Sequence, residues 1–104
     1  MNTRSPAHLP PHAIDESIEE CVIARRNFYL GLWAARQLDL PEASLHAYAL
    51  DVVAADYEEP GNEDVIRKLT RDFAAHGRDI GREDIVRKLG ETYAVAARQF
   101  WMTD

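Results

Sequence analysis

The chain has 104 residues, of which 46% are hydrophobic and 29% charged, and its formal net charge is −6. A chain of this size and composition can bury the core of one ordinary domain, so we expect a single folded unit. The acidic excess argues against nucleic-acid binding, which normally requires a net basic face.

The N-terminal segment is predicted to be an arm rather than part of a helix. Pro6, Pro10 and Pro11 interrupt any helix, so residues 1–12 are expected to form a flexible or extended arm. A long first helix is predicted over about residues 13–38, because acidic side chains near its start favour the positive end of the helix dipole. Its apolar stripe consists of Ile14, Ile18, Cys21, Val22, Phe28, Tyr29, Leu32 and Ala35. We expect Cys21, the single cysteine, to be a small core residue rather than a nucleophile.

Proline and glycine delimit three further helices, predicted over about residues 41–58, 62–76 and 82–102. Asn62 is expected to cap the third helix by accepting its free amides, and Gly77 to end it. The apolar positions of these helices are Leu45, Tyr48, Ala49, Val52 and Val53, then Val65, Ile66, Leu69 and Phe73, then Ile85, Val86, Leu89, Tyr93, Ala96, Ala97, Phe100 and Trp101. The predicted fold is therefore all-α, a four-helix bundle over residues 13–104 with a long first helix.

The third and fourth helices have similar sequences. "EDVIRKLTRDFA" at 63–74 aligns with "EDIVRKLGETYA" at 83–94. A duplicated helix would explain the likeness, and so would convergence of two amphipathic helices with acidic starts.

The first helix also carries polar residues and a glycine among its apolar ones. Gly31 costs about 1 kcal/mol relative to alanine in a helix interior, which a close crossing of two helices would offset. Arg25 and Arg26 can form ion pairs with acidic residues of the same chain, or they can border a binding site together with the acidic turn after the second helix. The candidate partner- or ligand-binding residues are Arg25, Arg26, Asn27, Trp33, Asp56, Tyr57, Glu58 and Glu59.

Several of these residues belong to a set of specific motifs. The set comprises "ARRN" at 24–27, "GLWAA" at 31–35, Tyr48, "VV" at 52–53, "ADYEEPG" at 55–61 and "EDV" at 63–65. With these motifs the chain resembles the zeta subunit family of alphaproteobacterial F-type ATP synthases, over about residues 15–102. The resemblance implies a four-helix protein that binds the catalytic head of the ATP synthase, at its alpha, beta and gamma subunits, and inhibits ATP hydrolysis. It also implies no catalytic residue and no cofactor, and we expect a monomer when the protein is free.

The N-terminal segment departs from the family pattern. The resemblance implies an inhibitory element there, a charged stretch that becomes helical and wedges between catalytic subunits. This chain has "MNTRSPAHLPPHAI" instead, with Leu9 and Ile14 as its large apolar anchors. Two readings follow: an inhibitor that uses a different arm or its helical body, or a divergent paralogue that has lost the inhibitory segment and binds another protein or a small ligand.

Other chemistry has little support in the sequence. There is no glycine-rich phosphate loop, no nucleophile elbow and no pair of cysteines, so we expect no enzymatic activity. His8 and His12 have the spacing of a helical metal pair, but prolines lie between them, and we expect no metal site. The longest uncharged run of hydrophobic character, from Asn27 to Ala35, is far shorter than the roughly 20 apolar residues of a membrane span. We therefore expect a cytoplasmic protein that does not insert into the membrane and reaches it only through the ATP synthase.

Overall fold

The computed structural model describes residues 11–56 and 61–102, with side chains described from residue 17 onward. Four helices make up this part of the chain, and it contains no strand. They are α1 (Pro11–Gln37), α2 (Glu42–Ala54), α3 (Glu63–Ala75) and α4 (Arg82–Met102). The predicted all-α fold with a long first helix is confirmed.

The structure differs from the expected helix boundaries at the start of α1 and at the end of α2, and from the expected cap at α3. α1 begins at Pro11, a residue assigned to the arm; a proline suits the first helical position because it needs no hydrogen-bonded N–H. The rest of the predicted arm, residues 1–10, lies outside the described residues. α2 ends at Ala54, earlier than expected, with Ala55 and Asp56 in a turn. Asn62 precedes α3 as predicted, but its side chain makes no capping hydrogen bond.

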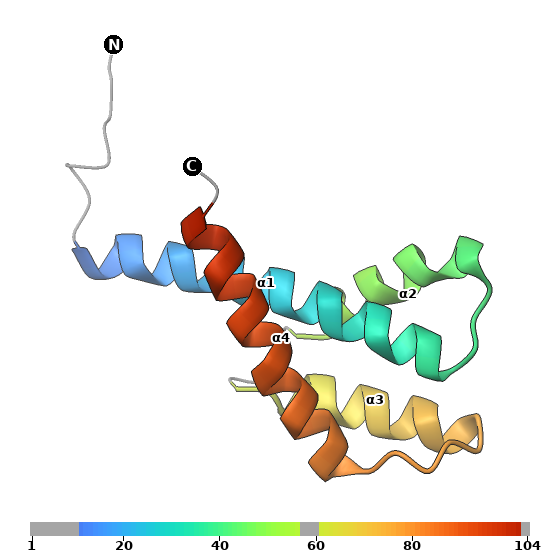
Figure 1. Ribbon diagram of the computed structural model, residues 1–104. Coiled ribbons are helices and arrows are strands. Elements are labelled where there is room, and N and C mark those ends of the chain that lie inside the picture. The colour runs from blue at the N-terminus through green and yellow to red at the C-terminus, as the bar shows by residue number, and fades with distance from the viewer. Residues whose placement is uncertain (1–10, 57–60, 103–104) are drawn as a thin grey trace.

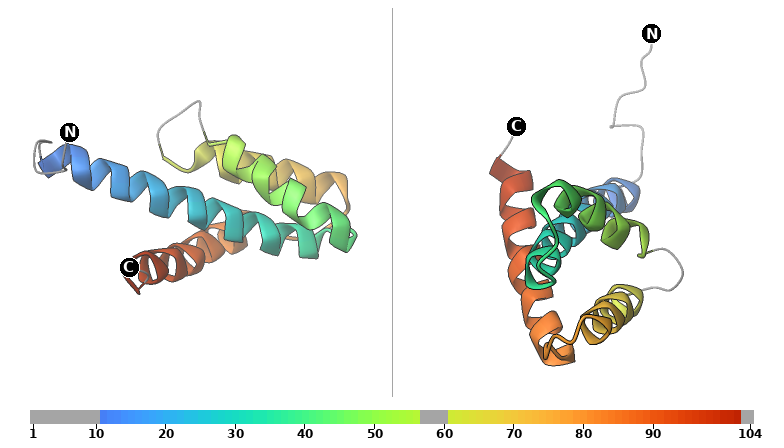
Figure 2. Two further views of the ribbon diagram at one scale, coloured as in Figure 1. Left: turned by 90° about the horizontal axis from the view of Figure 1, so that it is seen from above. Right: turned by 90° about the vertical axis from the view of Figure 1, so that its right-hand side faces the viewer.

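The helices pack around a core to which all four contribute (Figure 1). α2 runs back along α1 in the opposite direction, and α4 crosses α1 at a steep angle (Figure 2). α3 packs beside the first half of α4. It also contacts α1 through side chains: the rings of Phe73 and Trp33 pack edge to face, with 5.7 Å between their centres. The buried core consists of Leu30, Ala34, Leu38, Val52, Val65, Ile66, Leu69, Phe73, Ile85 and Leu89.

Gly31 lies at a close approach of α1 and α2. A Cβ atom added there would come within 2.6 Å of the Cα of Ala49 and 3.1 Å of the Val52 side chain. The first of these neighbours is backbone and cannot move aside without shifting α2. The predicted close crossing is therefore confirmed, and it accounts for a glycine in the middle of α1.

The core confirms some of the apolar stripes and corrects others. All four apolar residues predicted for α3 are buried. In α1 the buried set includes Leu30 and Ala34, which the predicted stripe omitted, because α1 packs against α2 on one side and α4 on another. Cys21 is exposed, so its assignment to the core was wrong. In α4 Val86 and Trp101 are exposed by 46% and 71%, and Thr92 is buried instead.

Candidate functional site

Two polar residues from the middle of α1 and one from the turn after α2 form one hydrogen-bonded network. Arg26 donates from Nε and Nη2 to the Asn27 Oδ1, at 3.0 and 2.8 Å. Asn27 in turn donates from Nδ2 to Asp56 Oδ2 at 3.0 Å. The guanidinium and the Asp56 carboxylate are 3.9 Å apart, so Asn27 bridges the two charges.

This network is almost completely removed from solvent. Arg26 and Asn27 are 5% and 1% exposed, and the Asp56 side chain is 15% exposed. Burial lowers the pKa of Arg26 below its ordinary value, while the negative charges of Asp56 and Glu19 act in the opposite direction. A buried amide or cation that loses its partner costs several kcal/mol, so the network holds the end of α2 against α1.

A second pair, whose charge acts on Arg26, connects α1 to α4. The Tyr93 hydroxyl donates to both carboxylate oxygens of Glu19, at 3.1 and 3.2 Å. This hydrogen bond raises the pKa of Tyr93, with burial contributing in the same direction. From the sequence, Tyr93 was predicted only as an apolar position of the fourth helix. Glu19 was one of the acidic side chains near the start of the first helix. Their pairing could not be anticipated, since it depends on how α4 crosses α1.

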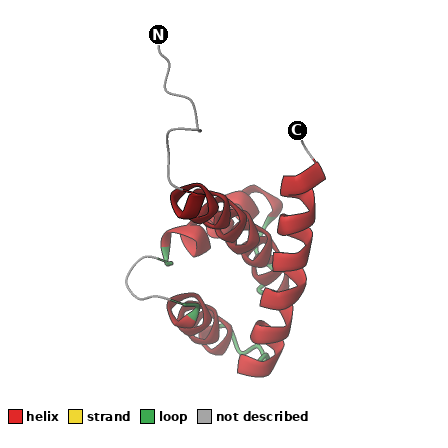
Figure 3. Ribbon diagram, turned by 90° about the vertical axis from the view of Figure 1, so that its left-hand side faces the viewer, coloured by secondary structure: helices red, strands yellow, loops and turns green. Residues whose placement is uncertain are grey.

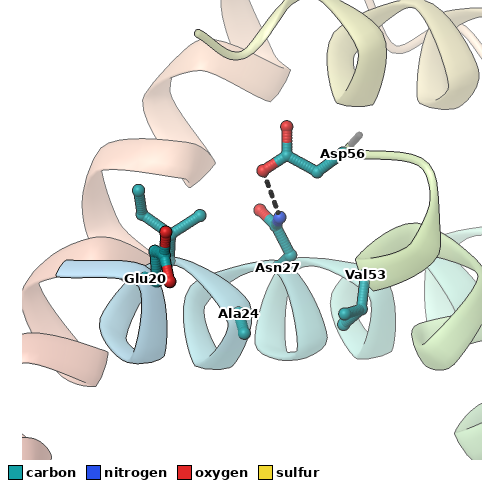
Figure 4. A pocket seen from close by; sticks show the side chains of 6 residues that line it. Glu20, Ala24, Asn27, Val53 and Asp56 are labelled. Carbon is teal, nitrogen blue, oxygen red and sulfur yellow. Dashed lines mark hydrogen bonds between the residues drawn. The ribbon is translucent and has the colours of Figure 1, made fainter. Parts of the chain in front are cut away.

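A pocket lies beside this network, between α1 and the C-terminal end of α2 (Figure 4). Its volume is about 460 Å³, and the described residues that line it are Glu20, Ile23, Ala24, Asn27, Val53 and Asp56. In the close view the Asn27 amide points to Asp56, while Glu20 lies a little under two helical turns before it on α1. The wall therefore combines two carboxylates and an amide with small apolar side chains.

The other predicted site residues do not all join this network. Arg25, directly beside Arg26, is exposed. Trp33 is partly buried and contacts the core through Phe73, with the Lys88 ammonium 5.5 Å from the centre of its ring. Tyr57, Glu58 and Glu59 lie outside the described residues.

A further polar cluster, between α2 and α3, was not predicted as a unit. Tyr48 and Lys68 both donate to Asp72 Oδ2, at 2.6 and 3.0 Å, and the Lys68 ammonium also lies 5.0 Å from the centre of the Tyr48 ring. Burial would raise the pKa of Asp72, but the two hydrogen bonds outweigh it and leave this pKa below its ordinary value. Burial and the same hydrogen bond raise the pKa of Tyr48. The only sequence signal was the spacing of Lys68 and Asp72 by one helical turn.

Within the described ranges, no group of three His, Cys, Asp or Glu side chains is placed to hold a metal ion. None of the described helices is long and apolar enough to cross a membrane. The Arg26–Asn27–Asp56 network connects α1 to the turn after α2, and the Tyr48–Lys68–Asp72 cluster connects α2 to α3. The pocket beside Asn27 is a candidate place for a binding partner.

Comparison with known proteins places the chain in a family of regulatory subunits. Residues 1–99 match the model of the family described as ATPase inhibitor subunit zeta. The chain belongs to this family, as its motifs predicted. A comparison with curated proteins returned no match. The matched region begins at residue 1, so it includes the proline-containing segment that departs from the expected inhibitory pattern.

Proposed function

We propose that this protein binds the catalytic head of an F-type ATP synthase and inhibits ATP hydrolysis. The observation that carries the proposal is the family match over residues 1–99, which spans the motif set of α1 and α2 and the segment before them. The role is regulatory and non-enzymatic, and the protein acts on the cytoplasmic side of the membrane, with the alpha, beta and gamma subunits as its contacts.

Inhibition of this kind needs no chemistry from the inhibitor. A rotary ATPase hydrolyses ATP only while its catalytic interfaces open and close in turn, so a polypeptide buried in one interface stops the cycle mechanically. Binding energy comes from apolar area buried in that interface, and it must exceed the entropic cost of ordering a segment on contact. The described helices supply a body whose buried network fixes α1 against α2, and the segment before Pro11 supplies a candidate wedge.

The test is a hydrolysis assay with the isolated ATPase head of an alphaproteobacterial host. Purified protein at increasing concentration should slow ATP hydrolysis to a saturating limit. A hydrolysis rate that stays constant at saturating protein would reject the proposal.

Two variants show whether the N-terminal segment takes part. Leu9 is one of its two large apolar anchors, so Leu9→Asp should raise the concentration needed for half-inhibition at least tenfold. Thr3→Asp adds the same charge without removing an apolar anchor and serves as the control. Equal inhibition by both variants and the unmodified protein would assign inhibition to the helical body.

The pocket beside Asn27 favours a second candidate function, a helical module that binds a small ligand. Glu20 on its wall favours a ligand with a cationic group, since the Asp56 carboxylate is already paired with Arg26 through Asn27. Adding spermidine should shift the NMR amide signals of Ala24 and Val53, and Glu20→Gln should weaken that response. Signals that do not move at millimolar spermidine would reject binding of a small polyamine in this pocket.

A further inference from the structure

The last turn of α4 exposes a large aromatic side chain. Trp101 is 71% exposed, and its neighbour Met102 is 72% exposed. The ring of Phe100 packs edge to face against Trp101, with 5.3 Å between the ring centres. Trp33, in contrast, packs against the core. The end of α4 is therefore an apolar surface that no described helix covers, and a surface of this kind marks a contact site.

The contacts between α1 and α4 show from which side Trp101 can be reached. Glu19 pairs with Tyr93 on one side of α4, whereas Tyr29 donates to Gln99 on another side. Trp101 lies about 80° around the helix from Tyr93 and about 160° from Gln99. α1 therefore crosses α4 with its first turns on the side of Trp101. The start of α1 and the end of α4 lie on the same side of the molecule, the side that faces the viewer in Figure 3.

The ten residues before Pro11 are long enough to reach Trp101. Pro11 lies eight residues before Glu19, about 12 Å along α1. Trp101 lies eight residues after Tyr93, about 12 Å along α4. With a steep crossing and axes about 10 Å apart, Pro11 and Trp101 are separated by about 20 Å. An extended chain covers about 3.3 Å per residue, so the length of residues 5–10 matches this separation.

The sequence of this segment suits an aromatic surface. Residues 5–10 read "SPAHLP", with Pro6 and Pro10 flanking the apolar Leu9. Proline restricts the chain before binding, and its ring packs on aromatic side chains, as in the recognition of proline-rich peptides by aromatic grooves. Because the segment is joined to α1, its local concentration at Trp101 is high, so even a small contact area is occupied.

The charges of the segment complement those of the first half of α1. Residues 1–10 contain Arg4 and no acidic residue, whereas residues 11–24 contain four acidic residues and no lysine or arginine. Each attraction between exposed charges of opposite sign is weak. Together these attractions favour a segment that folds back beside α1 over one that extends away from it.

We propose that residues 5–10 fold back across the start of α1 and pack Pro6 against Trp101 in the free protein. The contact holds the segment on the body, so the ATPase head must displace it before the segment can enter a catalytic interface. This consequence rests on the proposed function. The contact itself rests on the exposed ring, the reach of the segment and its composition. It lowers the apparent affinity for the head in proportion to the fraction of molecules in which the segment is released.

The contact is tested by NMR on the free, full-length protein. The signal of the Trp101 Nε1–H, assigned by its loss in Trp101→Phe, reports what lies against the ring. Pro6→Asp removes the proline ring and should shift this signal. Thr3→Asp adds the same charge outside residues 5–10 and should leave the signal in place. An unchanged signal in Pro6→Asp, or an equal shift in both variants, would overturn the contact. So would a signal that moves with protein concentration, because it would assign the contact to a second copy of the chain.

The effect on inhibition is tested with the isolated ATPase head. Trp101→Ala releases the segment and should lower the concentration for half-inhibition by about threefold or more. Met102→Ala, at the neighbouring and equally exposed position, should leave it within about twofold, and neither variant should change the Tm. A higher half-inhibition concentration in Trp101→Ala would mean that Trp101 contacts the head itself, and would overturn the regulatory role. Failure of the unmodified protein to inhibit would overturn the proposed function, while the NMR signals would still decide the contact.

Discussion

α3 and α4 begin with nearly the same sequence, yet the fold uses them differently. In each helix an aspartate near the start accepts a hydrogen bond from the arginine three residues later, at 2.9 Å for Asp64 and 3.0 Å for Asp84. The aligned lysines, Lys68 and Lys88, each lie over an aromatic ring of another helix. The burial of the apolar side chains differs between the two helices. The apolar face of α3 is covered by its neighbours, whereas Val86 of α4 is exposed. Local sequence therefore determines the helix and its ion pairs, and the packing of neighbouring helices decides which apolar side chains are buried.

The largest expected difference between the two helices is at Ile66 and Val86. Ile66→Ala should lower the free energy of unfolding by about 2 to 4 kcal/mol, because it leaves a cavity in the core. Val86→Ala should change it by no more than about 0.5 kcal/mol, since nearly half of the valine is already in water. Urea unfolding followed by circular dichroism measures both values. A similar loss in the two variants would show that α4 is covered as α3 is.

The next difference concerns glycine. Gly90→Ala should stabilise the fold by up to about 1 kcal/mol, because alanine is the better helix former and its methyl group has free space. Gly31→Ala makes the same change where α2 is in contact, and should destabilise the fold by about 1 to 3 kcal/mol. Thermal unfolding of the two variants should thus shift Tm in opposite directions. Shifts of the same sign would contradict the contrast between the covered and open helix faces.

The smallest difference is in the response to acid. Asp72 of α3 aligns with Thr92 of α4, whose hydroxyl donates to two backbone carbonyl groups of its own helix, those of Lys88 and Leu89. Because the pKa of Asp72 is lowered in the fold, its contribution to stability is complete above the unfolded value of about 3.9 and is lost as the pH falls through the lower folded value.

Asp72→Asn should therefore cost about 1 kcal/mol at pH 7 and flatten the loss of stability below pH of about 4. Thr92→Val serves as the control, because it removes no titratable group and should shift stability equally at every pH. Free energies of unfolding measured at pH 7 and in acid compare the two variants. An unchanged acid response in Asp72→Asn would mean that the Tyr48 and Lys68 hydrogen bonds do not lower this pKa.

The sequence predicted most of the fold and part of the candidate site. Local sequence was enough to predict the four helices, the close crossing at Gly31 and the buried face of α3. Each of these features depends on a single face of a single helix. The buried face of α1 was harder to predict, because α1 contacts both α2 and α4. Leu30 and Ala34 are buried although the predicted stripe did not include them, and Cys21 is exposed although it did.

The polar part of the site shows a similar division. Arg26, Asn27 and Asp56 were named from their motifs, but the order of the contacts, with Asn27 as the bridge, depends on where α2 ends. The pairing of Tyr93 with Glu19 was missed, because it arises from the angle at which α4 crosses α1. Helix crossing angles depend on side chains far apart in the sequence, so periodicity within one helix does not determine them.

The length of α1 has a mechanical consequence. Its 27 residues form a rod roughly 40 Å long, and its first turns extend past the other helices (Figure 1). Glu19 already contacts Tyr93 of α4, so only the turns of α1 before it project from the packed body as a rigid spacer toward the segment that precedes Pro11. Two attachments joined by a stiff spacer cooperate only when their targets on the partner are separated by the matching span. Under the proposed function, the projecting turns would therefore select pairs of contact surfaces on the ATPase head that lie at the matching separation.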